Sequence, residues 1–167
     1  ALVDFSGNMP QLIAHNETSF PEEIRNNILT LCSSGDNEID RCGQLDIEIG
    51  HLFSQAVNAL LIKAKISATE ILAIGSHGQT VRHRPALPSA FTLQIGDPNT
   101  IAHQTGITTI ADFRRKDIAL GGQGAPLLPA FHRAVFKSSS KHTAIVNIGG
   151  FGNVTLLNPL KQWPLGF

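Results

Sequence analysis

Apolar residues recur at helical spacing in one long stretch of the chain. Over residues 45–65 they stand three or four positions apart and share one face, formed by Leu45, Ile49, Phe53, Ala56, Leu60 and Ala64. A second helix is expected from Pro21 to Gly35, because proline suits a first helical position and glycine a helix end. Its apolar stripe would comprise Ile24, Ile28, Leu31 and Cys32. The polar residues 36–42 between the two are expected to form a loop.

Short apolar runs bounded by turn residues predict the strands. They cover residues 1–5, 11–18, 71–74, 91–95, 107–113, 143–147 and 154–157. A short helix from Pro98 to Gly106 and another from Pro126 separate the later strands. Continuous apolar runs suit strands buried on both faces, so we expect an α/β fold with a mixed sheet flanked by helices.

Composition narrows the class of partner. Hydrophobic residues make up 42% of the 167 residues, charged residues only 16%, and thirteen basic side chains balance thirteen acidic ones. A chain without net charge has no excess of positive charge to attract nucleic acid or an anionic membrane, so a small-molecule partner is expected. Cys32 and Cys42 cannot build a disulfide framework, which fits a cytoplasmic protein. The seven scattered histidines show no zinc spacing, so no metal site is expected.

Both ends of the chain are apolar, whereas chain ends are usually polar. Either neighbouring sequence is absent or both ends pack onto the core, and the pattern favours neither reading.

Three polar clusters follow predicted strands, at the sheet edge where α/β proteins bind ligands. The first is 75–80, with the polar residues 82–84 just after it. The second is Asp112–Asp117 with three consecutive cations, and the third is Gly121–Gly124 before a helix. The side chains of the first cluster suit sugar hydroxyls, and the cations of the second suit an anionic substrate group. The backbone N–H groups of the third, next to a helix start, suit an anion. The plain structural readings of the first two are a glycine-rich turn and a solvated ion-pair loop. The third lacks the Gly-Lys-Ser/Thr ending of a P-loop, which excludes that reading. Together the clusters favour a small-molecule site.

A fourth feature runs from Asn147 to Asn153, where a strand turns on glycines into a second strand. Such a turn brings backbone amides to phosphates in several nucleotide-binding folds, and it also makes an ordinary hairpin. The pattern alone does not choose between the two.

Six blocks of the sequence resemble, in order, those of the anhydro-N-acetylmuramic acid kinase family. They are Ser76–Thr80, Leu93–Gly96, Thr105–Ile107, Ala111–Arg115, Gly121–Leu127 and Asn147–Gly150. The resemblance implies a lobe with a ribonuclease H-like sheet, as in the two-lobed sugar kinase, heat-shock ATPase and actin superfamily. Residues 1–142 would be the first lobe without its first strand, and residues 143–167 the opening hairpin of the second.

The resemblance also implies a reaction. ATP and Mg²⁺ would bind between the lobes, and a water activated by an aspartate would open the 1,6-anhydro bridge of anhydro-N-acetylmuramic acid while O6 takes the γ-phosphoryl group. The product, N-acetylmuramic acid 6-phosphate, belongs to peptidoglycan recycling. The expected partners are the amino sugar and ATP, with no nucleic acid and no membrane, and a homodimer stays open.

The resemblance also assigns site residues, each by the family block in which it lies. The sugar side would comprise His77, Gly78, Gln79, Thr80, Asp112, Arg114, Arg115, Lys116, Asp117 and Gln123. The nucleotide side would comprise Asn147, Gly149, Gly150 and Asn153. The lactyl carboxylate needs a cation, for which Arg114, Arg115 and Lys116 are the candidates; family members commonly have arginine at position 116, and lysine lacks its bidentate geometry.

Two family blocks have no counterpart in the chain. A Met-Ser-Gly-Thr-Ser-x-Asp-Gly hairpin would precede residue 1, and the base aspartate would follow Phe167. We therefore expect a fragment that is inactive alone. A non-catalytic amino-sugar-binding or regulatory module and another sugar kinase of the superfamily remain alternatives.

Overall fold

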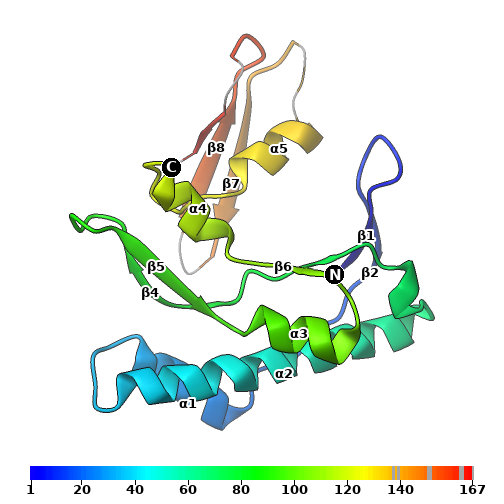
Figure 1. Cartoon of the computed structure of the whole chain (residues 1–167). Coiled ribbons are helices and arrows are strands. Elements are labelled where there is room, and N and C mark those ends of the chain that lie inside the picture. Colours follow the sequence, from blue (N-terminus) through cyan, green and yellow to red (C-terminus); the bar gives the residue numbers. More distant parts are fainter. Residues whose placement is uncertain (137, 139, 150–151, 162–163, 167) are drawn as a thin grey trace.

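The fold was obtained as a computed structural model, which describes residues 1–136, 138, 140–149, 152–161 and 164–166 (Figure 1). In these ranges the helices are α1 (Glu22–Leu31), α2 (Glu38–Ala64), α3 (Pro98–Thr105), α4 (Phe113–Ala119) and α5 (Pro129–Phe136), with a 3-10 turn η1 (Ala68–Glu70). The strands are β1 (Leu2–Asp4), β2 (Gln11–Ala14), β3 (Ile74–Gly75), β4 (Gln79–Arg84), β5 (Phe91–Ile95), β6 (Thr109–Ile110), β7 (Thr143–Ile148), β8 (Gly152–Leu157) and β9 (Leu165–Gly166). The predicted α/β class is confirmed.

The strands pair in small sheets instead of the single mixed sheet expected from the sequence. Over the described ranges these are the antiparallel pairs β1–β2 and β4–β5, the parallel pair β3–β6 and the antiparallel sheet β7–β8–β9. The run 71–74 enters a strand only at Ile74, and Leu72 is 95% exposed, so the buried strand expected there is wrong. A strand is buried on both faces only where other elements cover both, and no described element covers Leu72. The ribonuclease H-like arrangement stays a prediction.

The core lies between α1, α2 and the β4–β5 hairpin (Figure 1). It is formed by Ile28, Leu31, Leu45, Ile49, Val81 and Ile95. These include the central residues of the two predicted helical stripes, whereas Cys32, expected on the first stripe, is exposed. Full burial of one such aliphatic side chain contributes about 1.5–3 kcal/mol, so this cluster fixes how the hairpin lies on the two helices.

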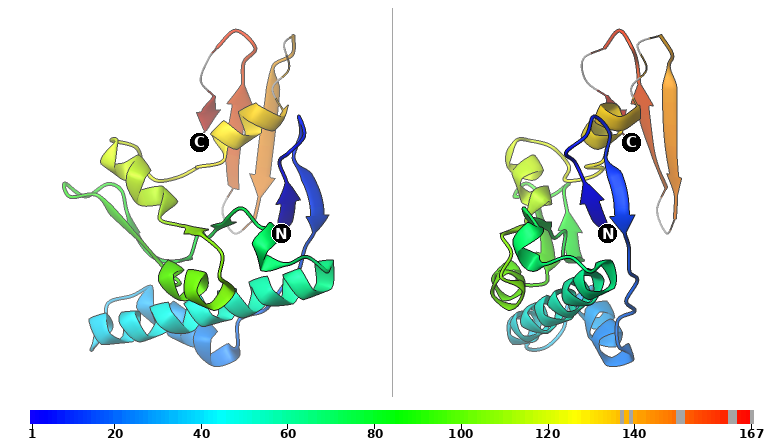
Figure 2. Two further views of the ribbon diagram at one scale, coloured as in Figure 1. Left: turned by 45° about the vertical axis from the view of Figure 1, so that its right-hand side comes forward. Right: turned by 90° about the vertical axis from the view of Figure 1, so that its right-hand side faces the viewer.

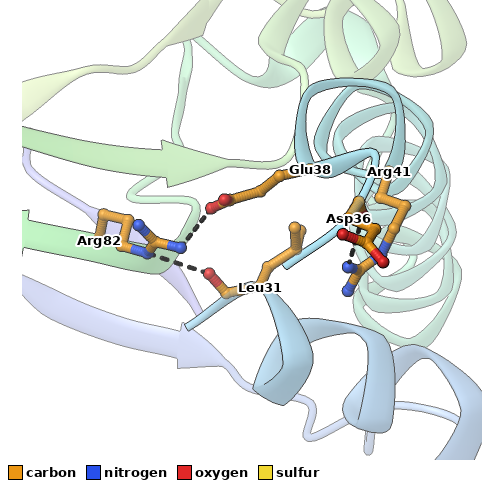
Figure 3. Close-up of polar contacts among 5 residues, drawn as sticks. All are labelled: Leu31, Asp36, Glu38, Arg41 and Arg82. Carbon is orange, nitrogen blue, oxygen red and sulfur yellow. Dashed lines mark hydrogen bonds and ion pairs between the residues drawn. The ribbon is translucent and has the colours of Figure 1, made fainter. Parts of the chain in front are cut away.

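Helix α2 begins at Glu38, so the loop expected over 36–42 is wrong for its last five residues. This first part adds no buried apolar side chain to the core, since Ile39 is 88% exposed and Cys42 is only partly buried. An ion pair holds it instead: the Arg82 guanidinium contacts the Glu38 carboxylate and donates through Nε to the carbonyl oxygen of Leu31 at 3.1 Å (Figure 3). Arg82 thus joins β4 to the end of α1 and the start of α2.

Hydrogen bonds to Asp46 hold the turn between β5 and α3 against α2. The N–H of Gly96 donates to the Asp46 carboxylate at 2.6 Å, and the N–H of Asp97 donates to the Asp46 carbonyl oxygen at 3.0 Å. Gly96 has φ +117°, and a Cβ there would lie 2.9 Å from the ring of Phe53. Only glycine fits this close approach in this conformation. The predicted short helix is confirmed, with Asp97 before Pro98 at its start and Gly106 at its end.

Helix α5 contacts the β7–β8–β9 sheet, which lies at the opposite end of the molecule from α1 and α2 (Figures 1 and 2). The buried side chains of His132 and Thr155 share a hydrogen bond of 2.9 Å between Nδ1 and Oγ1. The helix expected from Pro126 begins at Pro129, because proline takes the first helical position there as well.

Candidate functional site

The parallel pair β3–β6 brings the first two polar clusters to one edge. The N–H of Ser76 donates to the carbonyl oxygen of Ile110 at 2.8 Å, so the two strands end side by side. Ser76–Thr80 leaves from the first strand and Asp112–Asp117 follows the second. This placement is the one expected from parallel strands.

Both clusters differ locally from the sequence expectation. The strand expected over 107–113 ends at Ile110, because Asp112 has φ +61° and α4 begins at Phe113. The segment Asp112–Asp117 is therefore mostly helical and not a charged loop. Residues 79–84, which the sequence placed in a glycine-rich turn and its polar continuation, form β4.

Arg114 connects the three polar clusters. Its Nε donates to Nε2 of His77 at 2.7 Å, and its Nη1 donates to the carbonyl oxygen of Gly124 at 2.5 Å. A guanidinium can only donate, so Nε2 of His77 accepts and the ring hydrogen is assigned to Nδ1. That hydrogen points to the carbonyl oxygen of Gly78 at 2.8 Å. The hydrogen bonds thus assign a single tautomer to an uncharged His77.

Hydrogen bonds to Asp117 hold the third cluster against the end of α4. Its carboxylate accepts the N–H of Gly124 at 2.7 Å, and its backbone carbonyl accepts the N–H of Gly122 at 2.9 Å. A Cβ at position 122 would collide with the Asp117 carboxylate, so any other residue there would displace the carboxylate from the N–H of Gly124. Gly124 has φ +74°, a conformation that favours glycine.

The three consecutive cations differ in their environments. Arg114 is committed to His77 and Gly124. Arg115 forms an exposed ion pair of 3.2 Å with Asp112, which matches the plain reading of a solvated charge pair and is worth little in stability. The ammonium group of Lys116 has no hydrogen-bond or ion-pair partner within the described ranges. Arg115 and Lys116 are therefore the two cations that remain open to an anionic group.

The remaining sugar-side residues line the start of β4 and the glycine segment. Gly78 has φ +73°, and a Cβ there would lie 2.8 Å from the carbonyl oxygen of Ile95, so the turn presses against β5. The Gln79 amide donates to the carbonyl oxygen of Thr80 at 3.1 Å. Gln123 is exposed between two glycines. The predicted residues of the sugar side thus lie on connected segments.

Gln94, on β5, lies beside these segments, although it is not among the site residues predicted from the sequence. Its Nε2 donates to Thr80 Oγ1 at 3.1 Å and to Thr92 Oγ1 at 2.7 Å, while its Oε1 is buried without a hydrogen-bond partner. The signal in the sequence was the alternation of two polar residues, Thr92 and Gln94, within an apolar strand.

The predicted nucleotide-side residues lie on the β7–β8–β9 sheet. Asn147 and Asn153 are paired across β7 and β8, and Gly149 is exposed just after β7, whereas Gly150 lies outside the described residues. The Asn153 Oδ1 is buried without a partner. Within the described ranges no hydrogen bond or ion pair joins this group to the sugar-side segments, so the structure assembles one side of the expected site.

Two kinds of feature are absent from the part of the chain that the structure describes. No group of three or more His, Cys, Asp or Glu residues is arranged there to hold a metal ion. No helix in that part of the chain has the length and apolar character needed to cross a membrane.

Comparison with known proteins identifies the family. The family profile described as anhydro-N-acetylmuramic acid kinase matches residues 1–167. The chain belongs to the anhydro-N-acetylmuramic acid kinase family. Relatives with that name from Shewanella sp. (strain ANA-3), Shewanella oneidensis and Shewanella baltica (strain OS223) are each 57% identical over 166 residues. The match covers 99% of this chain and 45% of each relative, so the chain spans less than half of their length.

Membership of the anhydro-N-acetylmuramic acid kinase family confirms the resemblance seen in the sequence. Three of the blocks that carried it, at 76–80, 111–115 and 121–127, are the ones that hydrogen bonds to Arg114 and Asp117 hold together. The family blocks and the connected polar segments are thus largely the same residues.

Proposed function

We propose that this chain forms the amino-sugar side of an ATP-dependent kinase that acts on anhydro-N-acetylmuramic acid. The observation that carries the proposal is the Arg114 network, in which His77, Gly124 and Asp117 join three polar segments at the ends of β3 and β6. A structural domain has no need to gather glycines, amides and open cations at one edge. The names of the 57% identical relatives support the substrate.

The proposed reaction forms one bond at C1 and one at O6. The oxygen of a water molecule binds C1 and the C1–O6 bond breaks, while O6 takes the γ-phosphoryl group of ATP and ADP leaves. A base accepts the proton of the water, and the product is N-acetylmuramic acid 6-phosphate. Such catalysis consists mainly of positioning and charge stabilisation. We place the reaction in cytoplasmic peptidoglycan recycling.

Within this chain each proposed role follows from the environment of the residue. Arg115 and Lys116 are open to the lactyl carboxylate, whereas Arg114 and Asp117 position the segments. Gly78, Gln79, Thr80 and Gln123 offer backbone and amide groups to the sugar. His77 takes part through its hydrogen bond to Arg114, and Asp112 through its ion pair with Arg115.

The nucleotide side is proposed on the β7–β8 hairpin. Amide side chains at Asn147 and Asn153 and the backbone of Gly149 and Gly150 suit phosphate oxygens. We propose that Mg²⁺ binds with the phosphates of ATP, and we assign no step to the metal. We propose residues 1–142 and 143–167 as parts of two lobes, and expect the isolated chain to be inactive.

The test uses a protein of the relatives' full length that contains this sequence. Incubated with ATP, Mg²⁺ and the anhydro sugar, it is expected to yield a product heavier by one water and one phosphoryl group in mass spectrometry. Absence of this product, or equal phosphorylation of sugars without the anhydro bridge, contradicts the proposal. Uptake of the sugar in calorimetry without any product identifies a binding module instead. For the 167-residue chain alone, ADP formation above a blank contradicts the expected inactivity.

A further inference from the structure

We propose that Gln94 is a specificity-determining residue whose Oε1 accepts a hydrogen bond from the acetamido N–H of the sugar, an inference that rests on the proposed function. The residue lies on β5 directly across from Thr80 on β4. The turn at Gly78 presses on it, since a Cβ at position 78 would lie 3.2 Å from the Gln94 Cβ. Gln94 is therefore next to the turn that carries His77 and its bond to Arg114.

The orientation of the Gln94 amide is set by its two neighbours. The Thr92 hydroxyl lies 3.3 Å from the Arg82 carbonyl oxygen and 3.1 Å from His83 Nδ1. Its hydrogen can go to either of these acceptors, which leaves the Thr92 oxygen as an acceptor for Gln94 Nε2. Thr80 Oγ1 accepts the second amide hydrogen. Both hydrogens are thus used, and rotating the amide by half a turn would lose the bond to Thr92. The carbonyl oxygen is held in place as an acceptor only.

That oxygen is also costly to leave unpaired. Gln94 Oε1 is buried from solvent and has no hydrogen-bond partner, although the residue as a whole is only half-buried. Buried polar groups in folded proteins are nearly always paired, so an unpaired acceptor at the edge of a site calls for a donor from the ligand. Beside it, the Thr80 hydroxyl accepts from Gln94 and keeps its own hydrogen for an acceptor.

The chemistry of the sugar selects the donor. C1 and C6 share the bridging oxygen and O3 carries the lactyl group, so the donors are the acetamido N–H at C2 and the hydroxyl at C4. Both can donate to the fixed acceptor. We assign the acetamido N–H to it, because that group can only donate, and the C4 hydroxyl is the alternative that the experiment separates. The hydroxyl of Thr80 then donates to the ether oxygen at C3. Gln94 and Thr80 together recognise an acetamido group next to an ether.

The test compares three sugars in the full-length protein: the substrate, an analogue without the acetamido group at C2 and an analogue without the hydroxyl at C4. For Gln94→Met we expect KM for the substrate and for the C4 analogue to rise about 10-fold to 100-fold with kcat little changed. KM for the C2 analogue should stay the same as in the unchanged protein. Gln94→Glu keeps an acceptor oxygen and should restore part of the loss. Gln44→Met, on the exposed face of α2, is the matched control.

The outcomes separate the two proposals. If the unchanged protein forms no phosphorylated sugar, the proposed function fails and this inference fails with it. This inference alone is wrong if the unchanged protein is active but Gln94→Met raises KM equally for all three sugars. It is also wrong if Gln94→Met raises KM for the substrate and the C2 analogue but not for the C4 analogue, because Gln94 would then bind the C4 hydroxyl. A circular dichroism melt of each variant shows whether the fold is kept, and Gln94→Glu serves if Gln94→Met does not fold.

Discussion

The Nε atom of Arg114 lies 2.7 Å from Nε2 of His77, and the hydrogen bond between them places a guanidinium beside an uncharged imidazole. The same side chain reaches the carbonyl oxygen of Gly124 through Nη1. Three segments distant in sequence therefore depend on one residue. Arg114 acts as a positioning residue, which separates it from the neighbouring cations.

Replacing Arg114 by lysine should loosen these segments, because an ammonium group cannot span the two acceptors with the geometry of a fork. We expect Arg114→Lys to lower the free energy of unfolding by about 1–3 kcal/mol, the range for hydrogen bonds made by charged groups. Urea denaturation measures the change. Arg115→Lys is the control, since that side chain is exposed and should shift stability by less than about 0.5 kcal/mol. Equal effects of the two variants would contradict the positioning role.

Two glycines in α2 should respond to alanine in opposite directions. Gly43 is exposed, and a Cβ there would meet no other part of the molecule within 4 Å, so Gly43→Ala should stabilise the protein by about 0.5–1 kcal/mol. At Gly50 a Cβ would lie 3.0 Å from the carbonyl oxygen of Asp97 and 3.1 Å from the Thr100 Cβ. Gly50→Ala should therefore separate α2 from α3 and destabilise. Thermal melts compare the two variants, and a rise in both midpoints would show that the two helices lie further apart.

Asp97, at the start of α3, should make the free energy of unfolding fall at acidic pH. Burial alone raises the pKa of the Asp97 carboxyl, but hydrogen bonds from Thr100 and Asn99 outweigh it, and the pKa lies below its usual value. The unfolded chain therefore takes up the proton first. The stabilisation by Asp97 is complete above about pH 5 and is lost as the pH falls through the unfolded pKa of about 3.9 toward the folded one.

Asp97→Ala measures this contribution. Near neutral pH the variant should be less stable by about 1 kcal/mol, the usual value of a helix N-cap. The difference in free energy of unfolding between variant and unchanged protein should shrink below about pH 4. A difference that stays constant over this range would show that the ionised carboxylate adds nothing.

The two cysteines should differ in reactivity. Burial raises the pKa of the Cys42 thiol, the carboxylates of Asp46 and Glu38 raise it further, and the Arg82 guanidinium opposes them. Since the thiolate is the reactive form, Cys42 should be alkylated by iodoacetamide more slowly than the exposed Cys32. Peptide mass spectrometry over a time course gives both rates. In urea the two rates should become similar, and a persistent difference would point to a cause other than the fold.

The helices could be predicted from the sequence better than the sheets, for a physical reason. The stripe that contains Leu45 and Ile49 is a local pattern, whereas the pairing of β3 with β6 depends on residues about 35 positions apart. Helix α4 was missed because its charged residues form no stripe. The site followed the same rule: strand ends located its segments, but only the side-chain geometry distinguishes the engaged Arg114 from Arg115 and Lys116.

That distinction gives the last prediction, on the cation that binds the lactyl carboxylate. Lys116 has no partner within the described ranges and Arg115 has only an exposed ion pair, so both are free to turn to an anion. In the full-length protein Lys116→Gln and Arg115→Gln should each raise KM for the anhydro sugar about 10-fold, the loss expected for one charge-assisted hydrogen bond. With an analogue that lacks the lactyl group the two variants should match the unchanged protein. If both variants bind the two sugars as the unchanged protein does, the carboxylate is held by Arg114 or by a cation outside α4, and the side chains of Arg115 and Lys116 are surface charges.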